Sequence, residues 1–291
     1  MKTFFGEKLK KSAFLGTLAL ISATSFLLVG CDKTTEHIDS KTSEQPQKKP
    51  VSKNVTTSEN LEDTTPDGKR IIYLTFDDGP NRGTENLLKI LHKRNVVATA
   101  FVVGKHVNGS TKQKKNFAEL QKDSLIEIAN HSFSHASNHY LDFYKNPEKV
   151  VADFDSANAI LGLNNKIART PGRNIWRLND VNVTDIASSK NAANQLQAAG
   201  YKLVGWDLEW RPTPKMSLKG NHQQMMKKVD SIFYNDLEKT SKHLVFLTHD
   251  QYLVDDESLA ELDAFINVLQ QSNRFEFRKI SEYPKINEIL N

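Results

Sequence analysis

Apolar residues from residue 70 onward follow two alternating patterns. Short runs rich in β-branched and aromatic residues predict strands. They lie at 71–76, 97–103, 125–130, 201–206 and 243–248. Longer segments between them repeat apolar positions with the helical period. They lie at 84–94, 112–122, 147–162, 190–199, 222–238 and 257–271. Because strands that are apolar throughout and separated by helices indicate a parallel sheet covered on both faces, we expect one α/β domain, either a barrel or a doubly wound sheet.

The first 69 residues are predicted to precede this domain. Residues 1–30 combine a basic start with an apolar run at 12–30, which is typical of a secretory signal. Leu28-Val29-Gly30-Cys31 resembles the lipobox of bacterial lipoproteins, which implies removal of the signal and lipidation of Cys31. The alternative is a transmembrane anchor, because a run of 19 residues is long enough to span a bilayer. Either segment would hold the domain at the extracellular face of the cytoplasmic membrane.

Composition then separates a tether from the domain. Residues 32–68 are rich in Lys, Glu, Ser, Thr and Pro and cannot bury enough apolar surface to order themselves. We therefore expect a lipidated cysteine and disordered tether over 31–69 and one catalytic domain over 70–291. Residues 1–30 carry four Lys and one Glu, so the net charge of +4 falls to +1 without them. That balance gives no reason to expect nucleic acid, and we expect a monomer.

Titratable residues follow the predicted strands, in each case just past the end of a strand. They are Asp77, Asp78, His131, Asp207, Glu209 and His249. Because the carboxyl ends of parallel strands meet at one edge of a sheet, these side chains should face one cavity. His135 lies four residues after His131, a spacing that places two imidazoles on one face of a helical turn. Two imidazoles and a carboxylate are a common ligand set for a divalent ion.

Five motifs in the domain resemble those of the polysaccharide deacetylases with a NodB-homology domain, carbohydrate esterase family four. Residues 75–80 (TFDDGP), 131–135 (HSFSH) and 247–249 (LTH) resemble the first, second and fifth motifs. Residues 169–173 (RTPGR) have the glycine one position earlier than the third motif, R-x-P-x-G. Residues 206–210 (WDLEW) are a shortened form of the fourth, D-x-x-D-W. The resemblance implies a distorted (β/α) barrel with seven or so parallel strands.

The resemblance also implies a role for each matching residue. Asp77 would be the general base, held ionised by Arg169, and His249 would be the general acid, supported by Glu209 or Asp207. The metal ligands would be Asp78, His131 and His135. Leu247 and Trp210 would line the slot for the acetyl methyl. Apart from the resemblance, we also expect substrate contacts from Pro171 and from Trp176, whose ring could stack on a sugar.

Residue chemistry is consistent with these roles. A divalent ion on two imidazoles and one carboxylate keeps positions open for water and substrate, and its bound water has a pKa near roughly 7. A carboxylate can then complete the deprotonation, while an acid protonates the amine leaving group. The ligands suit Zn²⁺, and Co²⁺, Ni²⁺ or Mn²⁺ fit them as well. Since Asp77 and Asp78 would point to opposite faces of a regular strand, we expect the Gly79-Pro80 turn to break that regularity.

The sequence thus predicts metal-dependent hydrolysis of N-acetyl groups on an extracellular amino-sugar polymer, with N-acetylglucosamine of peptidoglycan as the first candidate. Chitin oligomers, poly-N-acetylglucosamine and acetyl-xylan are alternatives that would use the same machinery. A different class of function is a non-catalytic lipoprotein that binds the cell wall. The expected partners are the polysaccharide and, through Cys31, the membrane.

Overall fold

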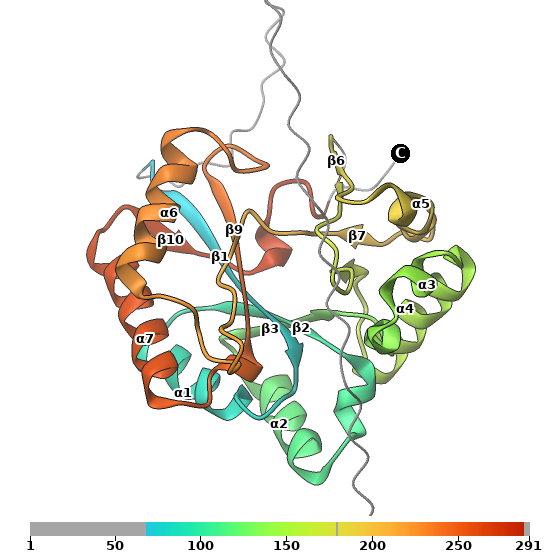
Figure 1. The fold of residues 1–291 in the computed structure, drawn as a ribbon, viewed down its shortest axis with the longest axis horizontal. Helices are drawn as coiled ribbons and strands as arrows, with labels where there is room; N and C mark the ends of the chain where they lie inside the picture. The colour runs from blue at the N-terminus through green and yellow to red at the C-terminus, as the bar shows by residue number, and fades with distance from the viewer. Residues whose placement is uncertain (1–67, 179, 288–291) are drawn as a thin grey trace, which may run out of the picture. The chain divides into compact units, whose positions relative to one another are not determined.

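A computed structural model describes residues 68–178 and 180–287 of the chain (Figure 1). The predicted signal peptide, Cys31 and almost all of the predicted tether lie outside the described residues. Within the described ranges, none of the helices has both the length and the apolar character needed to cross a membrane.

The described residues form one curved, mostly parallel sheet. Its strands are β1 (Arg70–Gly79), β2 (Ala98–Val102), β3 (Ile126–Asn130), β4 (Ile167–Ala168), β5 (Trp176–Leu178), β6 (Val181–Val183), β7 (Lys202–Leu203), β8 (Leu208–Glu209), β9 (His243–His249) and β10 (Phe275–Phe277). Their order is β6-β5-β7-β4-β3-β2-β1-β9-β8, with β10 beside β1. Every antiparallel pair between these strands involves β5, which pairs with β6 and β7. The eight strands other than β5 and β6 each have a parallel neighbour, which confirms the predicted distorted (β/α) barrel.

The helices pack around this sheet (Figure 1). They are α1 (Thr84–Arg94), α2 (Thr111–Lys122), α3 (Tyr140–Tyr144), α4 (Pro147–Leu161), α5 (Lys190–Ala198), α6 (His222–Tyr234) and α7 (Asp256–Gln271). All six predicted helices are present. The helix expected at 222–238 ends at Tyr234, because the chain turns at Asp236, which has a left-handed φ of 49°.

The predicted strand at 201–206 is the one that departs most from expectation, since only Lys202–Leu203 pair with a neighbour. The backbone beyond it is held by a side chain instead. Asn174 Oδ1 accepts a hydrogen bond from the Trp206 amide at 3.0 Å, and a Cβ on Gly205 would lie 2.0 Å from the same oxygen. The backbone at 205–206 thus packs directly against the Asn174 side chain.

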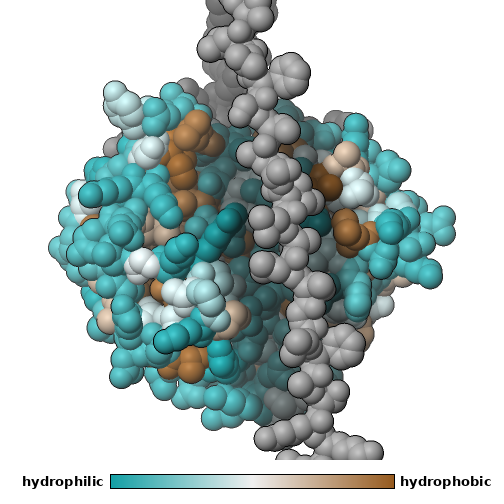
Figure 2. Space-filling model, in the orientation of Figure 1, coloured by the Kyte–Doolittle hydropathy of each residue, from teal (hydrophilic) through white to brown (hydrophobic). Residues whose placement is uncertain are grey.

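The central strand β1 is buried on both faces, as a parallel sheet requires. Ile72, Leu74 and Phe76 belong to the core cluster shared with α1, α6 and α7. Ile71 and Tyr73, whose side chains point to the opposite face of β1, belong to a second core cluster. The face drawn in Figure 2 is largely hydrophilic. Most of the large apolar residues of the described chain are buried in these interior layers.

Candidate active site

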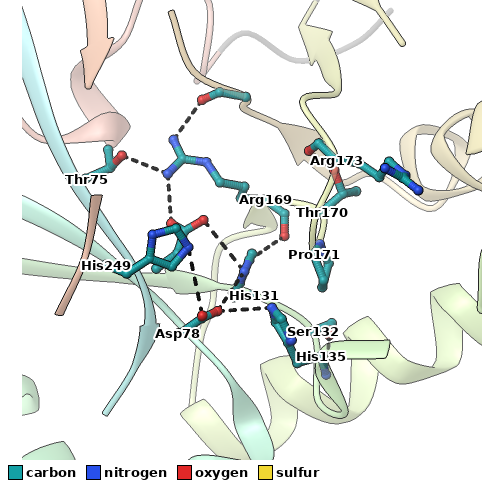
Figure 3. Close-up of polar contacts among 12 residues, drawn as sticks. Thr75, Asp78, His131, Ser132, His135, Arg169, Thr170, Pro171, Arg173 and His249 are labelled. Carbon is teal, nitrogen blue, oxygen red and sulfur yellow. Dashed lines mark hydrogen bonds and ion pairs between the residues drawn. The ribbon is translucent and has the colours of Figure 1, made fainter. Parts of the chain in front are cut away.

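A cavity of ≈ 910 Å³ lies where β1, β3 and β9 end (Figure 3). It brings together most of the titratable residues that follow the predicted strands. Those lining it are Asp77, Asp78, His131, His135, Glu209 and His249. The carboxyl ends of these strands therefore open into one cavity, as predicted. The chemistry of the site depends on how the side chains are arranged within it.

Both adjacent aspartates reach the cavity because β1 is irregular at Asp78. Opposite β2, Asp77 pairs with Phe101 and Gly79 pairs with Val102, so one extra residue is inserted in β1. Asp78 has a left-handed φ of 70°, and a bulge of this kind turns a side chain that would otherwise point to the other face. The expected break in regularity is present, and it lies at Asp78 itself, one residue before the Gly79-Pro80 turn.

Asp77 is buried against Arg169, which is itself completely inaccessible to solvent. The Arg169 Nη1 atom donates to Asp77 Oδ1 at 2.8 Å and to Thr75 Oγ1 at 2.7 Å. Its other nitrogens donate to the backbone carbonyls of Val204 and Gly205. Burial lowers the pKa of Arg169, while the charge of Asp77 opposes that effect. Each nitrogen of the guanidinium thus has an acceptor, and its charge can compensate the Asp77 carboxylate.

Asp78, His131 and His135 form a cluster whose ligand atoms all lie within 4.8 Å of one another. Asp78 Oδ1 lies 3.0 Å from His135 Nε2 and 3.4 Å from His131 Nε2, yet this buried oxygen makes no hydrogen bond. Burial acts to raise the pKa of Asp78, but its contacts with the two histidines hold it well below the usual value. His131 Nδ1 lies 2.9 Å from the Arg169 carbonyl oxygen. When Nδ1 carries the proton and donates to this oxygen, Nε2 has a lone pair available for a metal ion. An oxygen without a donor and two available nitrogens fit a divalent ion.

The two histidines do not meet through a helical turn, so that part of the prediction is wrong. Ser132 and His135 have φ values of 65° and 51°, and a short 3₁₀ segment starts only at His135. The rings nevertheless lie 5.1 Å apart. A left-handed loop, with the His135 amide donating to Ser132 Oγ at 3.0 Å, replaces the expected helix face.

His249 lies on the other side of Asp78. Its Nε2 atom is 3.8 Å from Asp78 Oδ2, and its ring packs against Tyr252 with centroids 5.0 Å apart. His249 Nδ1 is buried without a hydrogen-bond partner in the described structure. The sequence suggested either Glu209 or Asp207 as the acid that supports His249. Glu209 lines the same cavity as His249, and Asp207 does not.

Asp207 instead ties two backbone segments together. Its carboxylate accepts from the Val245 amide at 2.8 Å and from the Lys239 amide at 2.9 Å. Burial raises the pKa of Asp207 to about 6. Glu209 Oε2 accepts from Arg211 Nε at 3.0 Å. Asp207 is thus placed as a structural residue, and Glu209 is the acid that shares the cavity with His249.

Of the predicted substrate contacts, the structure places only Leu247 in the cavity wall. Trp210 is fully buried, donates from Nε1 to the Lys219 carbonyl and packs against aromatic core residues. Trp176 is also fully buried and donates to Asn174 Oδ1. Pro171 is buried with its carbonyl accepting from a tyrosine hydroxyl. The two tryptophan predictions are corrected, because both side chains belong to the core clusters. Pro171 is buried and does not line the cavity.

The structure adds cavity residues that sequence reasoning missed. His106 Nδ1 lies 2.8 Å from the Asp78 carbonyl oxygen, and Gln251 Nε2 donates to Asp78 Oδ2 at 3.0 Å. Tyr140 places its ring 5.8 Å from that of His135. The rule that polar residues follow strand ends would have found His106 after 97–103 and Gln251 after 243–248. Tyr140 follows no strand, and no sequence signal pointed to it.

Comparison with known proteins agrees with this geometry. A family model described as polysaccharide deacetylase matches residues 64–203. A peptidoglycan-N-acetylglucosamine deacetylase of Bacillus cereus is 27% identical over 223 residues, covering 74% of this chain and 70% of the relative. A chitin disaccharide deacetylase of Vibrio alginolyticus is 24% identical, and the match covers 50% of this chain and 48% of that protein.

Solved structures give the same result. The catalytic domain of a peptidoglycan N-acetylglucosamine deacetylase from Eubacterium rectale superimposes with a TM-score of 0.55 at 26% identity, covering 79% of this chain and 97% of that domain. The peptidoglycan deacetylase PdaC of Bacillus subtilis shares the fold, with a TM-score of 0.51 at 20% identity. Together with the motif residues gathered in the cavity, these matches support a polysaccharide deacetylase domain over residues 64–203, and the chain is similar over most of its length to enzymes with that activity.

Proposed function

We propose that this enzyme removes acetyl groups from N-acetylglucosamine in peptidoglycan. The observation that carries the proposal is one cavity that holds a charge-compensated carboxylate, Asp77, beside the Asp78–His131–His135 cluster and His249. Two of the similar proteins described above are named peptidoglycan N-acetylglucosamine deacetylases, which supports this polymer over the alternatives.

Asp78, His131 and His135 would hold a divalent ion, with Zn²⁺ as the ligand set's first choice and Co²⁺, Ni²⁺ or Mn²⁺ as substitutes. When bound, such an ion makes water a stronger acid and polarises the acetyl carbonyl. The protein contributes the orientation of its ligands. His131 is fixed through its contact with the Arg169 carbonyl, and His135 through the loop that follows Ser132.

Asp77 takes the proton from the attacking water. Arg169 occupies Asp77 Oδ1, and Oδ2 lies 3.6 Å from His131 Nε2, on the side of the metal cluster. A carboxylate held in this way has one oxygen bound by the guanidinium and the other free to accept a proton from water.

His249 supplies a proton to the departing amine. It faces Asp78 Oδ2, whereas the two histidine ligands face Asp78 Oδ1, so the proton donor lies beside the metal cluster without belonging to it. Leu247 lines the same cavity and offers apolar contact for the acetyl methyl. Glu209 is the cavity carboxylate that would support the charged form of His249.

The proposal places the enzyme at the outer face of the cytoplasmic membrane through lipidated Cys31. Its support is the sequence Leu28-Val29-Gly30-Cys31 and the apolar run before it. A lipid anchor with two acyl chains is sufficient for stable membrane attachment, and the polar segment that follows would let the domain reach the wall.

The test measures acetate released by the full-length protein from peptidoglycan, chitin oligomers, poly-N-acetylglucosamine and acetyl-xylan side by side. We expect peptidoglycan to be the best substrate. Asp77→Asn should lower acetate release by about 10²–10⁴-fold, the usual contribution of a general base. Asp230→Asn, an exposed carboxyl that pairs with Arg274, is the matched control and should retain full activity.

Three outcomes would change the proposal. Full activity of Asp77→Asn would remove Asp77 from the role of base. A better rate on chitin oligomers, poly-N-acetylglucosamine or acetyl-xylan would replace the polymer. Binding to peptidoglycan without any chelator-sensitive acetate release would favour the non-catalytic wall-binding protein.

A further inference from the structure

We propose that Gln251 is a positioning residue for the metal-binding carboxylate, holding one oxygen of Asp78 so that the other faces the two histidines. The Gln251 Nε2 atom donates to Asp78 Oδ2 at 3.0 Å. The inference rests on the proposed metal site, and it concerns a residue that lies outside the five sequence motifs.

Asp78 needs such support because little else fixes its carboxylate. Its backbone is at an irregular position of β1, with a left-handed φ of 70°. The torsion that rotates a carboxylate about its terminal bond is broad and is not restricted by rotamer preference. Oδ1, which faces His131 and His135, makes no hydrogen bond of its own. The amide of Gln251 is therefore the side-chain donor that sets the orientation of this group.

Gln251 can act in this way because its own segment is held rigidly against the loop that follows β1. Arg82 Nε donates to the Gln251 carbonyl at 3.2 Å. The preceding residue, Asp250, is buried and accepts a hydrogen bond from Thr84 Oγ1. A Cβ at Gly83 would lie only 1.8 Å from the Asp250 carbonyl oxygen, so the two loops pack backbone against backbone. The donor and the carboxylate thus belong to one connected unit.

The same hydrogen bond keeps the ligand apart from His249. His249 Nε2 lies 3.8 Å from Asp78 Oδ2, the oxygen that Gln251 occupies. Without the amide, the carboxylate could rotate toward His249, and Oδ1 would leave its place near His131 and His135. Partners that orient metal ligands typically change metal affinity by about 10–100-fold when removed.

The test compares zinc affinity of the full-length protein and Gln251→Met, measured by competition with a chelator in the absence of substrate. Methionine keeps the length of the side chain and removes the donor. We expect zinc to bind at least about tenfold more weakly, and acetate release to recover when zinc is saturating. Gln270→Met is the matched control, because Gln270 on α7 also donates a side-chain hydrogen bond, from Nε2 to the Arg94 carbonyl of α1 at 2.9 Å, and does not line the cavity. It should bind zinc like the unmodified protein.

Zinc affinity of folded Gln251→Met within twofold of the unmodified protein overturns the inference. Should that variant fail to fold, Gln251→Asn replaces it, since its shorter side chain cannot reach Asp78, and the same tenfold loss is expected. An unmodified protein that binds no divalent ion overturns the inference together with the metal site. Inactivity on peptidoglycan with intact zinc binding overturns only the proposed polymer, so the two failures are distinguishable.

Discussion

The buried ion pair of Arg169 and Asp77 shows how single residues of this enzyme depend on a partner that compensates their charge. Arg169 and Asp77 are both buried, and each is the other's only charged hydrogen-bond partner among the described residues. A buried pair contributes little net stability, because desolvation offsets the attraction between the charges. Removing one partner is costly, because the remaining charge is then buried without compensation.

Arg169→Met should therefore destabilise the protein by about 3–5 kcal/mol in urea denaturation. Adding Asp77→Asn to it should restore part of that loss, because no uncompensated charge remains. Arg274→Met removes an exposed arginine that pairs with Asp230 at 2.8 Å, and its effect should be about 0–1 kcal/mol. Similar losses for the two single variants would contradict this view of the buried pair.

Gly172 is the second residue for which the structure makes a direct prediction. Its φ is +63°, and a Cβ there would lie 2.9 Å from Cε1 of Tyr140, which lines the cavity. Gly172→Ala should lower both stability and acetate release, because it adds a steric clash to an unfavourable backbone conformation. Gly162 has a φ of +68° with no atom within 4 Å of its Cβ position, so Gly162→Ala measures the backbone cost alone.

The clash can be isolated by a third variant. Without the Tyr140 ring, Gly172→Ala should cost only about as much unfolding free energy as Gly162→Ala does. The double variant Gly172→Ala with Tyr140→Ala should therefore lose the sum of the Gly162→Ala and Tyr140→Ala losses. Urea denaturation of the four proteins measures this coupling. Equal destabilisation by the two glycine substitutions would show that Tyr140 does not occupy the space beside residue 172.

Among the elements, the connection between β9 and α1 depends on Asp250. Its carboxyl is buried, Oδ2 accepts from Thr84 at the start of α1, and Oδ1 has no partner in the described structure. Burial raises the pKa of Asp250 to about 7. Ionisation is thus less favourable in the folded protein than in the unfolded chain.

This shift predicts how stability changes with pH. Between about pH 4 and pH 7 the folded state keeps the Asp250 proton while the unfolded chain loses it, so stability falls as the pH rises through this window. The total effect is of order 4 kcal/mol, since each unit of pKa corresponds to about 1.4 kcal/mol. Urea denaturation across this range should show a dependence that Asp250→Asn lacks. Asp256→Asn, an exposed carboxyl on α7, should retain it.

For the whole molecule, the cluster of Asp78, His131 and His135 joins distant parts of the chain. Asp78 ends β1, whereas His131 and His135 follow β3, so an ion would link two strands that flank β2. Since only the folded protein brings these ligands together, zinc should stabilise it. At a concentration 100 times the dissociation constant, the gain is about 2.7 kcal/mol.

Thermal denaturation with and without zinc measures this link. His135→Ala should remove most of the stabilisation and also the acetate release. His92→Ala is the control, because the His92 ring is exposed on α1 and pairs with Asp123, away from the cavity. A zinc response in His135→Ala equal to that of the unmodified protein would place the ion elsewhere.

The local pattern of apolar and polar residues was enough to predict the α/β fold and the six helices. It also predicted the long strands β1, β2, β3 and β9 and most of the residues that gather at their ends. These features depend on periodicity and motif residues that lie close together in the chain. Strands such as β4 and β8 have two residues each, too few to show a period, and they form because neighbouring strands provide hydrogen bonds.

Side-chain direction was decided by tertiary contacts. Trp210 enters the core, Asp207 bonds backbone amides and Glu209 remains in the cavity, although all three belong to one motif. The orientation of Asp78 depends on a bulge against β2 and on Gln251, which is 173 residues away in the chain. Periodicity describes which residues can form an element, whereas the surroundings of each side chain come from segments that only folding brings together.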